Sequence, residues 1–324
     1  MRHASTPEVR GGGTPDRETF LADVLAGLAG SPRTLPCKYL YDAPGSELFD
    51  RICGLEAYYP TRTELAILAV HGAAIGASLG PGCLMVELGS GSSNKTRALL
   101  DHLDRPAGYV PVDISRTCLE QAAANLAADF PDLEVLPVCG DYMEPFALPA
   151  TRRSPIRRVI YFPGSTIGNL DPEEARDFLG SLVDLAAPGG DMVLGVDLLK
   201  DEAILNRAYD DPDGVTAAFN RNLLYRLRRD LGAEVDPEGF RHEARFNRDL
   251  GCMEMHLVSL SDQAIRVAGR EFRLDPGQSI RTERSYKYTL QGFRDLAASA
   301  GWVPTAVWTD HQEWFSIHRL HTGS

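Results

Sequence analysis

Between residues 83 and 199 the sequence alternates five times between short runs rich in Val, Ile, Leu and Met and longer stretches with helical spacing of apolar residues. Such alternation favours a parallel sheet joined by right-handed crossover helices. The strands hold few polar residues, as expected when helices cover both faces of a sheet. The sequence therefore predicts a doubly wound α/β fold. The expected strands are 83–89, 109–115, 133–141, 157–164 and 191–199, with helices at 95–103, 117–129 and 172–186.

The alternation stops after Lys200. Residues 201–232 have a helical pattern, and the segment to 285 has the composition of strands. A further helix and an antiparallel strand pair then close the chain. A helix from Arg17, a polar aromatic stretch and a long helix precede the α/β part. We therefore expect the core to be interrupted by an accessory domain made of two segments, over the open end of the sheet. The later expected elements are strands 253–260, 264–274, 279–288, 302–310 and 314–320, and helices 63–77 and 290–300.

Charge and composition limit the partners of this chain. Among 324 residues, 33 are Lys or Arg and 45 are Asp or Glu, which gives a net charge of −12. An acidic chain repels phosphate backbones, which argues against a nucleic-acid partner. No run approaches the roughly 18 apolar residues that span a bilayer, and residues 1–17 lack the apolar segment of a secretory signal. The six cysteines form no C-x-x-C pair and the histidines are scattered, so we expect free thiols, no metal and a cytoplasmic location.

A glycine loop follows the first expected strand, in VELGSG (86–91). Glycines such as Gly89 let the backbone pass close to a ligand without a Cβ in the way. Asp113 ends the second expected strand, where an acidic side chain can accept hydrogen bonds from both hydroxyls of a ribose. The combination favours a nucleotide site, although an ordinary strand–helix turn explains the glycines alone.

The residues near this loop favour S-adenosylmethionine (SAM) over a nicotinamide cofactor. Asn94 stands where the NAD fingerprint requires a third glycine. SAM carries no phosphate, and its methionine end is cationic. Glu87 at the strand tip, with Asp141 and Tyr142 after the third strand, suits that cation and the adenine amine. We expect SAM, with NAD as the alternative.

The loop after the fourth expected strand, PGSTIGN (163–169), is small and polar. Ligands of open α/β sheets bind beyond the carboxyl ends of the strands. We therefore expect this loop to face the transferable methyl group, with Asn169 able to donate and accept hydrogen bonds. The alternative is an ordinary turn in which Asn169 caps the helix that begins at Pro172.

Six segments spread along the chain carry a resemblance to a known family. They are KYLYDAPGSELFD (38–50), YYPTRTE (58–64), VELGSGSSNKT (86–96), GSTIGNL (164–170), RAYDDPDGVTAAFNRN (207–222) and TERSYK (282–287). Together they resemble the ergothioneine-pathway L-histidine Nα-methyltransferases, over residues 21–320. The combination of YYPTRTE with GSTIGNL is specific, whereas the glycine loop alone is not.

The resemblance implies a Rossmann-like class I methyltransferase core with a split α+β accessory domain. The core would comprise residues 63–199 and 286–324, and the substrate-binding accessory domain residues 17–62 and 200–285, after a flexible tail at 1–16. The implied enzyme converts L-histidine to its Nα-trimethyl betaine, hercynine, in three transfers from SAM. We expect it to be a monomer. A methyltransferase of another amino acid or small amine is the alternative; an NAD-dependent oxidoreductase and a non-catalytic nucleotide-binding protein are more distant ones.

The resemblance also implies site residues, transferred by matching motif positions. The implied SAM contacts are Tyr41, Gly89, Lys95, Asp113, Asp141 and Tyr142. The implied histidine contacts are Tyr58, Asn169, Tyr209, Met255, Glu283 and Ser285. Within the second set, Asn169 and Tyr209 would hold the amino-acid end and Glu283 with Ser285 the imidazole. His256 departs from the family pattern, which has a tryptophan there, and we expect it to reshape the pocket beside Met255.

Residue chemistry supports the imidazole assignment. Glu283 and Ser285 are two apart on an expected strand, so both side chains point to one face. A neutral imidazole offers one donor and one acceptor, which a carboxylate and a hydroxyl can meet. Without the resemblance, RTERSYK would also suit a surface strand of alternating charge. For the amine proton we expect loss to water, or transiently to Tyr41 or Tyr58, which with Asn169 form the expected catalytic set.

Overall fold

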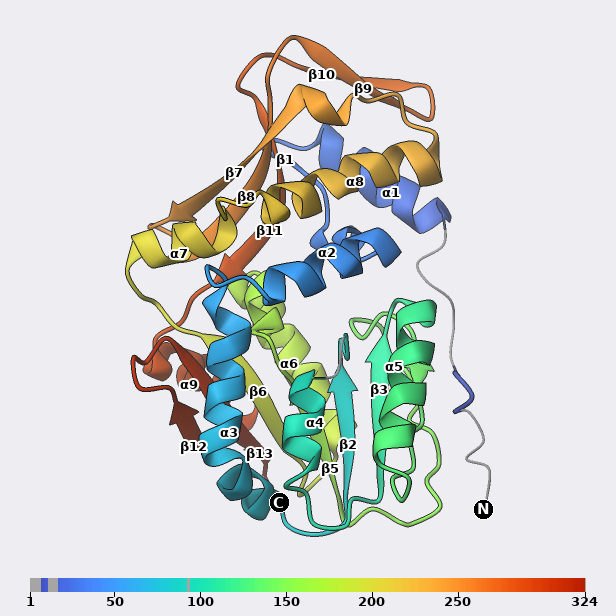
Figure 1. The fold of residues 1–324 in the computed structure, drawn as a ribbon, viewed down its shortest axis with the longest axis vertical. Helices are drawn as coiled ribbons and strands as arrows, with labels where there is room; N and C mark the ends of the chain where they lie inside the picture. Colours follow the sequence, from blue (N-terminus) through green and yellow to red (C-terminus); the bar gives the residue numbers. More distant parts are fainter. Residues whose placement is uncertain (1–6, 11–16, 92–93, 324) are drawn as a thin grey trace. The chain divides into compact units, whose positions relative to one another are not determined.

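The computed structural model describes residues 7–10, 17–91 and 94–323, which fold into two compact units (Figure 1). The first unit contains the described residues of 1–14, 60–199 and 288–324. The second contains the described residues of 15–59 and 200–287. Each unit is thus built from segments that are separated in the sequence. The assignment of substrate binding to residues 17–62 and 200–285 stays a prediction.

A seven-stranded mixed sheet forms the centre of the first unit. All neighbouring pairs from β6 to β4 are parallel, whereas β13 runs antiparallel to both of its neighbours. The predicted doubly wound α/β class is confirmed, and so is the closing antiparallel strand pair. In sheet order the strands are β12 (Trp302–Thr309), β13 (Phe315–Thr322), β6 (Asp191–Asp197), β5 (Arg157–Phe162), β2 (Cys83–Leu88), β3 (Gly108–Asp113) and β4 (Val138–Cys139).

Helices cover both faces of this sheet, because side chains of the fully buried strands alternate between two apolar clusters (Figure 1). Val86 points into the cluster with α6 (Pro172–Ala186) and α9 (Leu290–Ser299). Met85 points into the opposite cluster, which the remaining three helices supply. These are α3 (Tyr59–Leu79), α4 (Asn94–Leu100) and α5 (Arg116–Asp129). Two buried faces explain why the strand sequences are almost continuously apolar.

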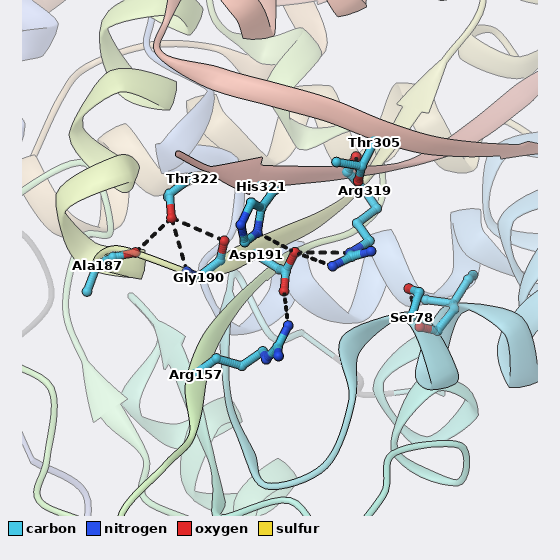
Figure 2. Close-up of polar contacts among 10 residues, drawn as sticks. Ser78, Arg157, Ala187, Gly190, Asp191, Thr305, Arg319, His321 and Thr322 are labelled. Atoms are coloured by element: carbon cyan, nitrogen blue, oxygen red, sulfur yellow. Dashed lines mark hydrogen bonds and ion pairs between the residues drawn. The ribbon is translucent and has the colours of Figure 1, made fainter. Parts of the chain in front are cut away.

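A buried carboxylate at the first residue of β6 joins three strands of the sheet (Figure 2). Asp191 is fully buried and accepts from Arg157 Nη1 at 3.2 Å and from Arg319 Nη2 at 2.8 Å. His321 Nδ1 lies 3.1 Å from the same carboxylate. These partners start β5 or lie on β13, so one side chain ties β5, β6 and β13 together.

The second unit packs helices against a four-stranded sheet. Its strands, in sheet order, are β1 (Arg33–Thr34), β11 (Ser279–Tyr286), β8 (Cys252–Ser259) and β7 (Phe240–Asn247), and β1 runs parallel to β11 while the other pairs are antiparallel. Its helices are α1 (Arg17–Ala29), α2 (Ala43–Cys53), α7 (Glu202–Tyr209) and α8 (Val215–Leu231). The predicted α+β character of this part is confirmed.

Two strand predictions were wrong in detail. The expected strand 133–141 is broken into an isolated bridge from Val135 to Tyr109 and the short β4 at Val138–Cys139, because Pro137 between them has no N–H to continue the ladder. The expected single strand 264–274 is a hairpin of β9 (Gln263–Val267) and β10 (Arg270–Leu274). Ala268 and Gly269 turn the chain there with φ values of 49° and 74°, as a two-residue hairpin turn requires.

Within the first unit, Arg10 of the N-terminal segment pairs with Val138 of β4. Arg10 N donates to the Pro137 carbonyl at 3.0 Å, and its own carbonyl accepts from Cys139 N at 2.7 Å. The rest of the predicted flexible tail, apart from residues 7–9, lies outside the described residues. All six cysteines are free thiols. None of the helices in the described ranges has the length and apolar character needed to cross a membrane.

Candidate functional site

The glycine loop and Asp113 meet at the carboxyl ends of β2 and β3. Gly89 and Gly91 have φ values of 71° and 44°, which favour glycine. The Gly91 amide donates to Asp113 Oδ2 at 3.3 Å, and Ser115 N donates to Oδ1 at 2.9 Å. Burial raises the pKa of Asp113 above its ordinary value. The carboxylate is held by backbone amides and keeps some exposure, so it can still accept from a ligand's hydroxyls.

Tyr142 lies beside the same loop. A Cβ added to Gly89 would lie 3.6 Å from Tyr142 Cε1, so ring and glycine are in contact distance. The ring also packs edge-on to Phe162, at 5.6 Å between centroids. Asp141 holds the preceding turn by accepting from Met143 N at 3.0 Å. A bare glycine backbone, a hydroxyl-accepting carboxylate and an aromatic ring together fit the nucleoside part of SAM.

Glu87 is not available to bind the cationic ligand that the sequence led us to expect. Its side chain is buried, and its carboxylate accepts from Tyr109 Oη at 2.5 Å and from Thr96 Oγ1 at 2.7 Å. Burial raises the pKa of Glu87 to about 8, against the effect of these two hydrogen bonds. The expectation was wrong because both oxygens already have partners on α4 and β3. Glu87 thus fixes the glycine loop's flanking elements.

Lys95 and the loop after β5 are joined by a carboxylate that the sequence reading missed. Glu64 is fully buried on α3, forms an ion pair with Lys95 Nζ at 2.6 Å and accepts from Gly164 N at 2.9 Å. Ser165 is held in the left-handed region, with φ 58°, and its Oγ accepts from Asp197 N at 2.8 Å. The loop is therefore rigidly positioned. The only sign in the sequence that Glu64 positions this loop is that Glu64 is the last residue of the YYPTRTE motif.

Asn169 ends the 3-10 helix η2 (Thr166–Asn169) and is partly exposed. Its side-chain amide forms no hydrogen bond with another described residue. The alternative expectation, an N-cap for α6, was wrong, because Asp171 caps that helix in a capping box with Glu174. The Asn169 amide is available to donate to and accept from a ligand.

In the second unit, aromatic rings gather around three predicted site residues. The rings of Tyr58 and Tyr209 lie 6.3 Å apart in a T-shaped arrangement. Phe49 links Tyr58 to Tyr41, with centroid distances of 6.2 and 5.4 Å. Burial raises the pKa of Tyr58 well above its ordinary value, with Tyr209 adding to the effect. Tyr41, an expected SAM contact, thus lies in this unit with the expected substrate contacts.

Glu283 and Met255 face each other across β11 and β8, where they are directly paired. Paired residues of antiparallel strands share a face of the sheet. Glu283 keeps partial exposure, whereas Met255 is buried. Burial raises the pKa of Glu283 to about 7, and Lys287 opposes the shift. The charge of the Glu283 carboxylate also contributes to the raised pKa of Tyr58.

Ser285 belongs to a buried polar triangle. Tyr209 Oη donates to Ser285 Oγ at 2.8 Å, and Lys287 Nζ donates to Ser285 Oγ at 2.7 Å and to Tyr209 Oη at 2.8 Å. Lys287 was not expected at the site, although its position two residues after Ser285 indicates the same face. The surface-strand reading of this segment was wrong, because Ser285 and Lys287 are buried.

A comparison with known families decides the class of this protein. The sequence pattern of the family described as "Histidine-specific methyltransferase, SAM-dependent" matches residues 20–322.

The chain belongs to this family.

Curated relatives agree with the membership. The chain is 43% identical over 299 residues to the histidine N-alpha-methyltransferase of Mycolicibacterium smegmatis, with 90% of this chain and 92% of the relative covered. It is 41% identical to the protein of the same name from Mycobacterium tuberculosis, covering 91% and 92%. Ergothioneine biosynthesis protein 1 of Neurospora crassa is 29% identical, covering 89% of this chain and 33% of the longer relative.

Membership confirms the predicted methyltransferase class and the predicted dependence on SAM. The individual contacts expected for SAM and histidine stay predictions.

One expectation about this histidine-specific methyltransferase, that His256 reshapes the pocket beside Met255, was wrong. Successive residues of β8 point to opposite faces of the sheet. His256 therefore points away from the face that carries Met255 and Glu283. Its Nε2 lies 3.4 Å from Glu254 and its Nδ1 3.2 Å from Ser279 Oγ, on the polar face.

Proposed function

We propose that this chain converts L-histidine to Nα,Nα,Nα-trimethylhistidine (hercynine) in three successive methyl transfers from SAM, as the first step of ergothioneine biosynthesis. The family match and the names of the mycobacterial and fungal relatives support the substrate and the pathway. The observation that carries the proposal is the Glu283–Ser285 pair, which offers one acceptor and one donor on a single face of β11.

Residues of the first unit would hold SAM, which supplies a methyl group on a positively charged sulfur. Asp113 would accept from the ribose hydroxyls, and Gly89 would let the backbone approach the ligand. Tyr142 would pack against the nucleoside, and Asp141 would lie beside it. Lys95 would act by holding Glu64 and, through it, the loop that ends at Asn169. Tyr41 is the proposed contact from the second unit.

The proposed histidine contacts divide by chemistry. Glu283 as a carboxylate accepts from the ring N–H, and Ser285 donates to the other ring nitrogen. Asn169 and Tyr209 hold the amine and carboxylate end of the amino acid. Their main task is orientation, because the lone pair of the amine must lie at roughly 3–3.5 Å from the methyl carbon, in line with the bond that breaks.

The amine must be neutral before each transfer. Burial holds the pKa of Tyr58 well above its ordinary value, so its phenol stays protonated and is a poor base. We therefore infer that the proton leaves to water and that Tyr58 serves as a neutral hydroxyl. A nearby positive sulfur and apolar rings favour the uncharged amine. In this mechanism Tyr58 does not act as a tyrosinate base.

The growing substrate becomes a quaternary ammonium ion. The faces of Tyr58 and Tyr209 can stabilise that cation, each by about 0.5–2 kcal/mol. Rings tolerate added methyl groups better than fixed carboxylates, which would require an N–H donor. The aromatic cluster of the second unit therefore suits three transfers.

We further infer that the protein is a monomer and lies in the cytoplasm. The six free thiols are in line with a reducing compartment.

Incubation of the purified protein with SAM and each standard amino acid tests the proposal. Among the amino acids, histidine alone should gain the mass of three CH2 units, because each transferred methyl group replaces a proton of the amine, with one S-adenosylhomocysteine released per transfer. Trimethylation of another amino acid in preference to histidine would contradict it. The Asn169→Ala variant serves as a check on the site, and we expect it to retain S-adenosylhomocysteine binding while kcat/KM for histidine falls about 10²-fold, as for loss of a positioning contact.

A further inference from the structure

Strand β11 changes the direction of its side chains just before Glu283. In a regular strand, residues two apart point to the same face of the sheet. Arg281 pairs with His256 on β8, and Glu283 pairs with Met255. Because His256 and Met255 are neighbours on β8, they point to opposite faces. Arg281 and Glu283 therefore also point to opposite faces, although they are two residues apart.

Thr282 is the residue that causes this change. Between the two pairs, β11 has one residue more than β8, which is a β-bulge. A shift by one residue turns every later side chain of a strand to the other face. The bulge therefore places Glu283, and Ser285 two residues after it, on the face of the sheet that carries Met255.

A buried amide on α8 holds this bulge. Asn220 is fully buried, and its Oδ1 accepts from Thr282 Oγ1 at 2.6 Å. The Met255 carbonyl lies 3.1 Å from the same hydroxyl, whose single proton goes to the nearer acceptor. Asn220 Nδ2 donates to the His256 carbonyl at 3.1 Å, and this contact identifies the amide nitrogen because a carbonyl only accepts. One side chain thus binds both strands at the bulge.

The same amide is connected to the end of α7. Asn220 Nδ2 lies 2.9 Å from His242 Nδ1. Because the amide nitrogen donates, this ring nitrogen accepts, and the proton of the neutral ring is on Nε2. Burial lowers the pKa of His242, which favours the neutral ring. His242 Nε2 then donates at 2.9 Å to the carbonyl of Tyr209, the last residue of α7. A helix leaves such a carbonyl without a partner of its own.

We propose that Asn220 is a positioning residue for both groups of histidine contacts. Through the bulge it directs Glu283 and Ser285 toward the substrate ring. Through His242 it holds the helix end that carries Tyr209. The inference rests on the proposed function and adds to it the residue that aligns the two ends of the substrate. Asn220 itself need not touch the substrate, because its amide acts through the protein groups that it binds.

Two substitutions of Thr282 separate its hydroxyl from its packing. Thr282→Val keeps the branched shape but loses the bond to Asn220, so kcat/KM for L-histidine should fall about tenfold or more, as for a displaced contact. Thr282→Ser keeps the hydroxyl and should stay within about threefold of the wild type. If the serine variant loses more activity than the valine variant, packing is what matters and the proposal is overturned.

A double-mutant cycle identifies the group through which the bulge acts. In a Glu283→Ala background, Thr282→Val should lower kcat/KM by a much smaller factor than in the wild type, because the carboxylate that the bulge directs is absent. His242→Phe removes the donor to the Tyr209 carbonyl and should cost the same factor in both backgrounds. Equal factors for Thr282→Val in the two backgrounds would contradict the proposed role.

Asn220→Ala tests the amide directly and should reduce kcat/KM at least as much as Thr282→Val. If it does not fold, Thr282→Val combined with His242→Phe replaces it, because this pair removes both connections. Ser259→Ala is the matched control. It removes another buried hydroxyl of the same sheet, which donates to the Ser261 carbonyl at 2.8 Å, and it should lower Tm but leave kcat/KM unchanged.

Turnover of histidine by the wild-type protein is measured first. If the wild type does not methylate histidine, the proposed function fails and this inference fails with it. If it does, but Thr282→Val lowers Tm and keeps the wild-type kcat/KM, the network around Asn220 is merely structural. That result overturns the inference and leaves the proposed function intact.

Discussion

Glu283 combines partial exposure with a pKa of about 7, raised by burial. A protonated carboxyl group cannot accept from a ring N–H as a carboxylate does.

The alternation along TERSYK was enough to predict that Glu283 and Ser285 share a face. It could not predict the Lys287 triangle, because the third member, Tyr209, comes from α7 and only the fold brings it near. Glu64 was missed for the same reason, since its partners are distant in the sequence.

Glu283→Gln should change the pH dependence of histidine turnover. Productive binding needs an ionised Glu283 and a neutral ring, so kcat/KM of the wild type loses a proton-linked factor for each as pH falls below about 7. Gln does not titrate. The acid limb of log kcat/KM against pH should therefore be less steep by about one in the variant, although its plateau is lower. Equal slopes in both proteins would contradict the role of Glu283.

Strands, helices and loops show where local patterns predict well. Helix α6 was expected at 172–186 and spans Pro172–Ala186, because proline and the capping box mark its start. Strand β7 lies in the segment expected to form strands, but it was given no bounds, since it is too polar for a period-two pattern. The break between β9 and β10 was not predicted, since a single alanine precedes the turn glycine. The junction of β2, β3 and α4 at Glu87 depends on burial that a sequence pattern does not reveal.

Glu87→Gln should stabilise the protein more at high pH than at low pH. The pKa of Glu87 is about 8 in the fold, against an ordinary value of 4.5 for the free side chain. Between these values the unfolded chain loses a proton that the folded chain keeps, so stability falls as pH rises. Gln resembles the protonated form and avoids this loss. The difference in Tm, variant minus wild type, should be larger at about pH 8 than at about pH 5.

The exposed Glu144→Gln is the matched control for that measurement and should show no trend with pH. A constant difference in Tm for Glu87→Gln across the range would mean that Glu87 is ionised in the fold.

Asp191→Asn should weaken the junction of β5, β6 and β13. The substitution leaves Arg157, Arg319 and His321 facing a neutral group (Figure 2). Removing one partner of a buried ion pair costs about 3–5 kcal/mol, and the partial exposure of the cations reduces this to about 2 kcal/mol. Urea unfolding measures the loss. The exposed Asp184→Asn should change stability by less than about 0.5 kcal/mol, and a similarly small effect for Asp191→Asn would refute the assignment.

At the scale of the whole molecule, the chain passes between its units three times after residue 17, at residues 59–60, 199–200 and 287–288. The end of the strand–helix alternation after Lys200 indicated such an interruption. The sequence could not show which side chains gather inside each unit. Five of the predicted SAM contacts lie in the first unit, and five of the predicted histidine contacts lie in the second.

This division predicts separable effects on the two ligands. Asp113→Ala should weaken S-adenosylhomocysteine binding about 10–100-fold, the effect of losing hydrogen bonds to a charged group. Glu283→Ala should leave that affinity unchanged and weaken histidine measured in the presence of S-adenosylhomocysteine. Calorimetric titration of each variant gives both values. Loss of S-adenosylhomocysteine binding in Glu283→Ala would show that the two sites are not separate.

The place of β13 inside the sheet affects how the protein is made. Its neighbour β6 ends at Asp197, but β13 begins only at Phe315, after the whole of residues 200–287. While a ribosome translates the intervening stretch, no strand in the described part of the chain covers that side of β6. An unpaired strand edge invites association with other nascent chains. The yield of folded protein should therefore depend on how well chaperones shield β6 during translation.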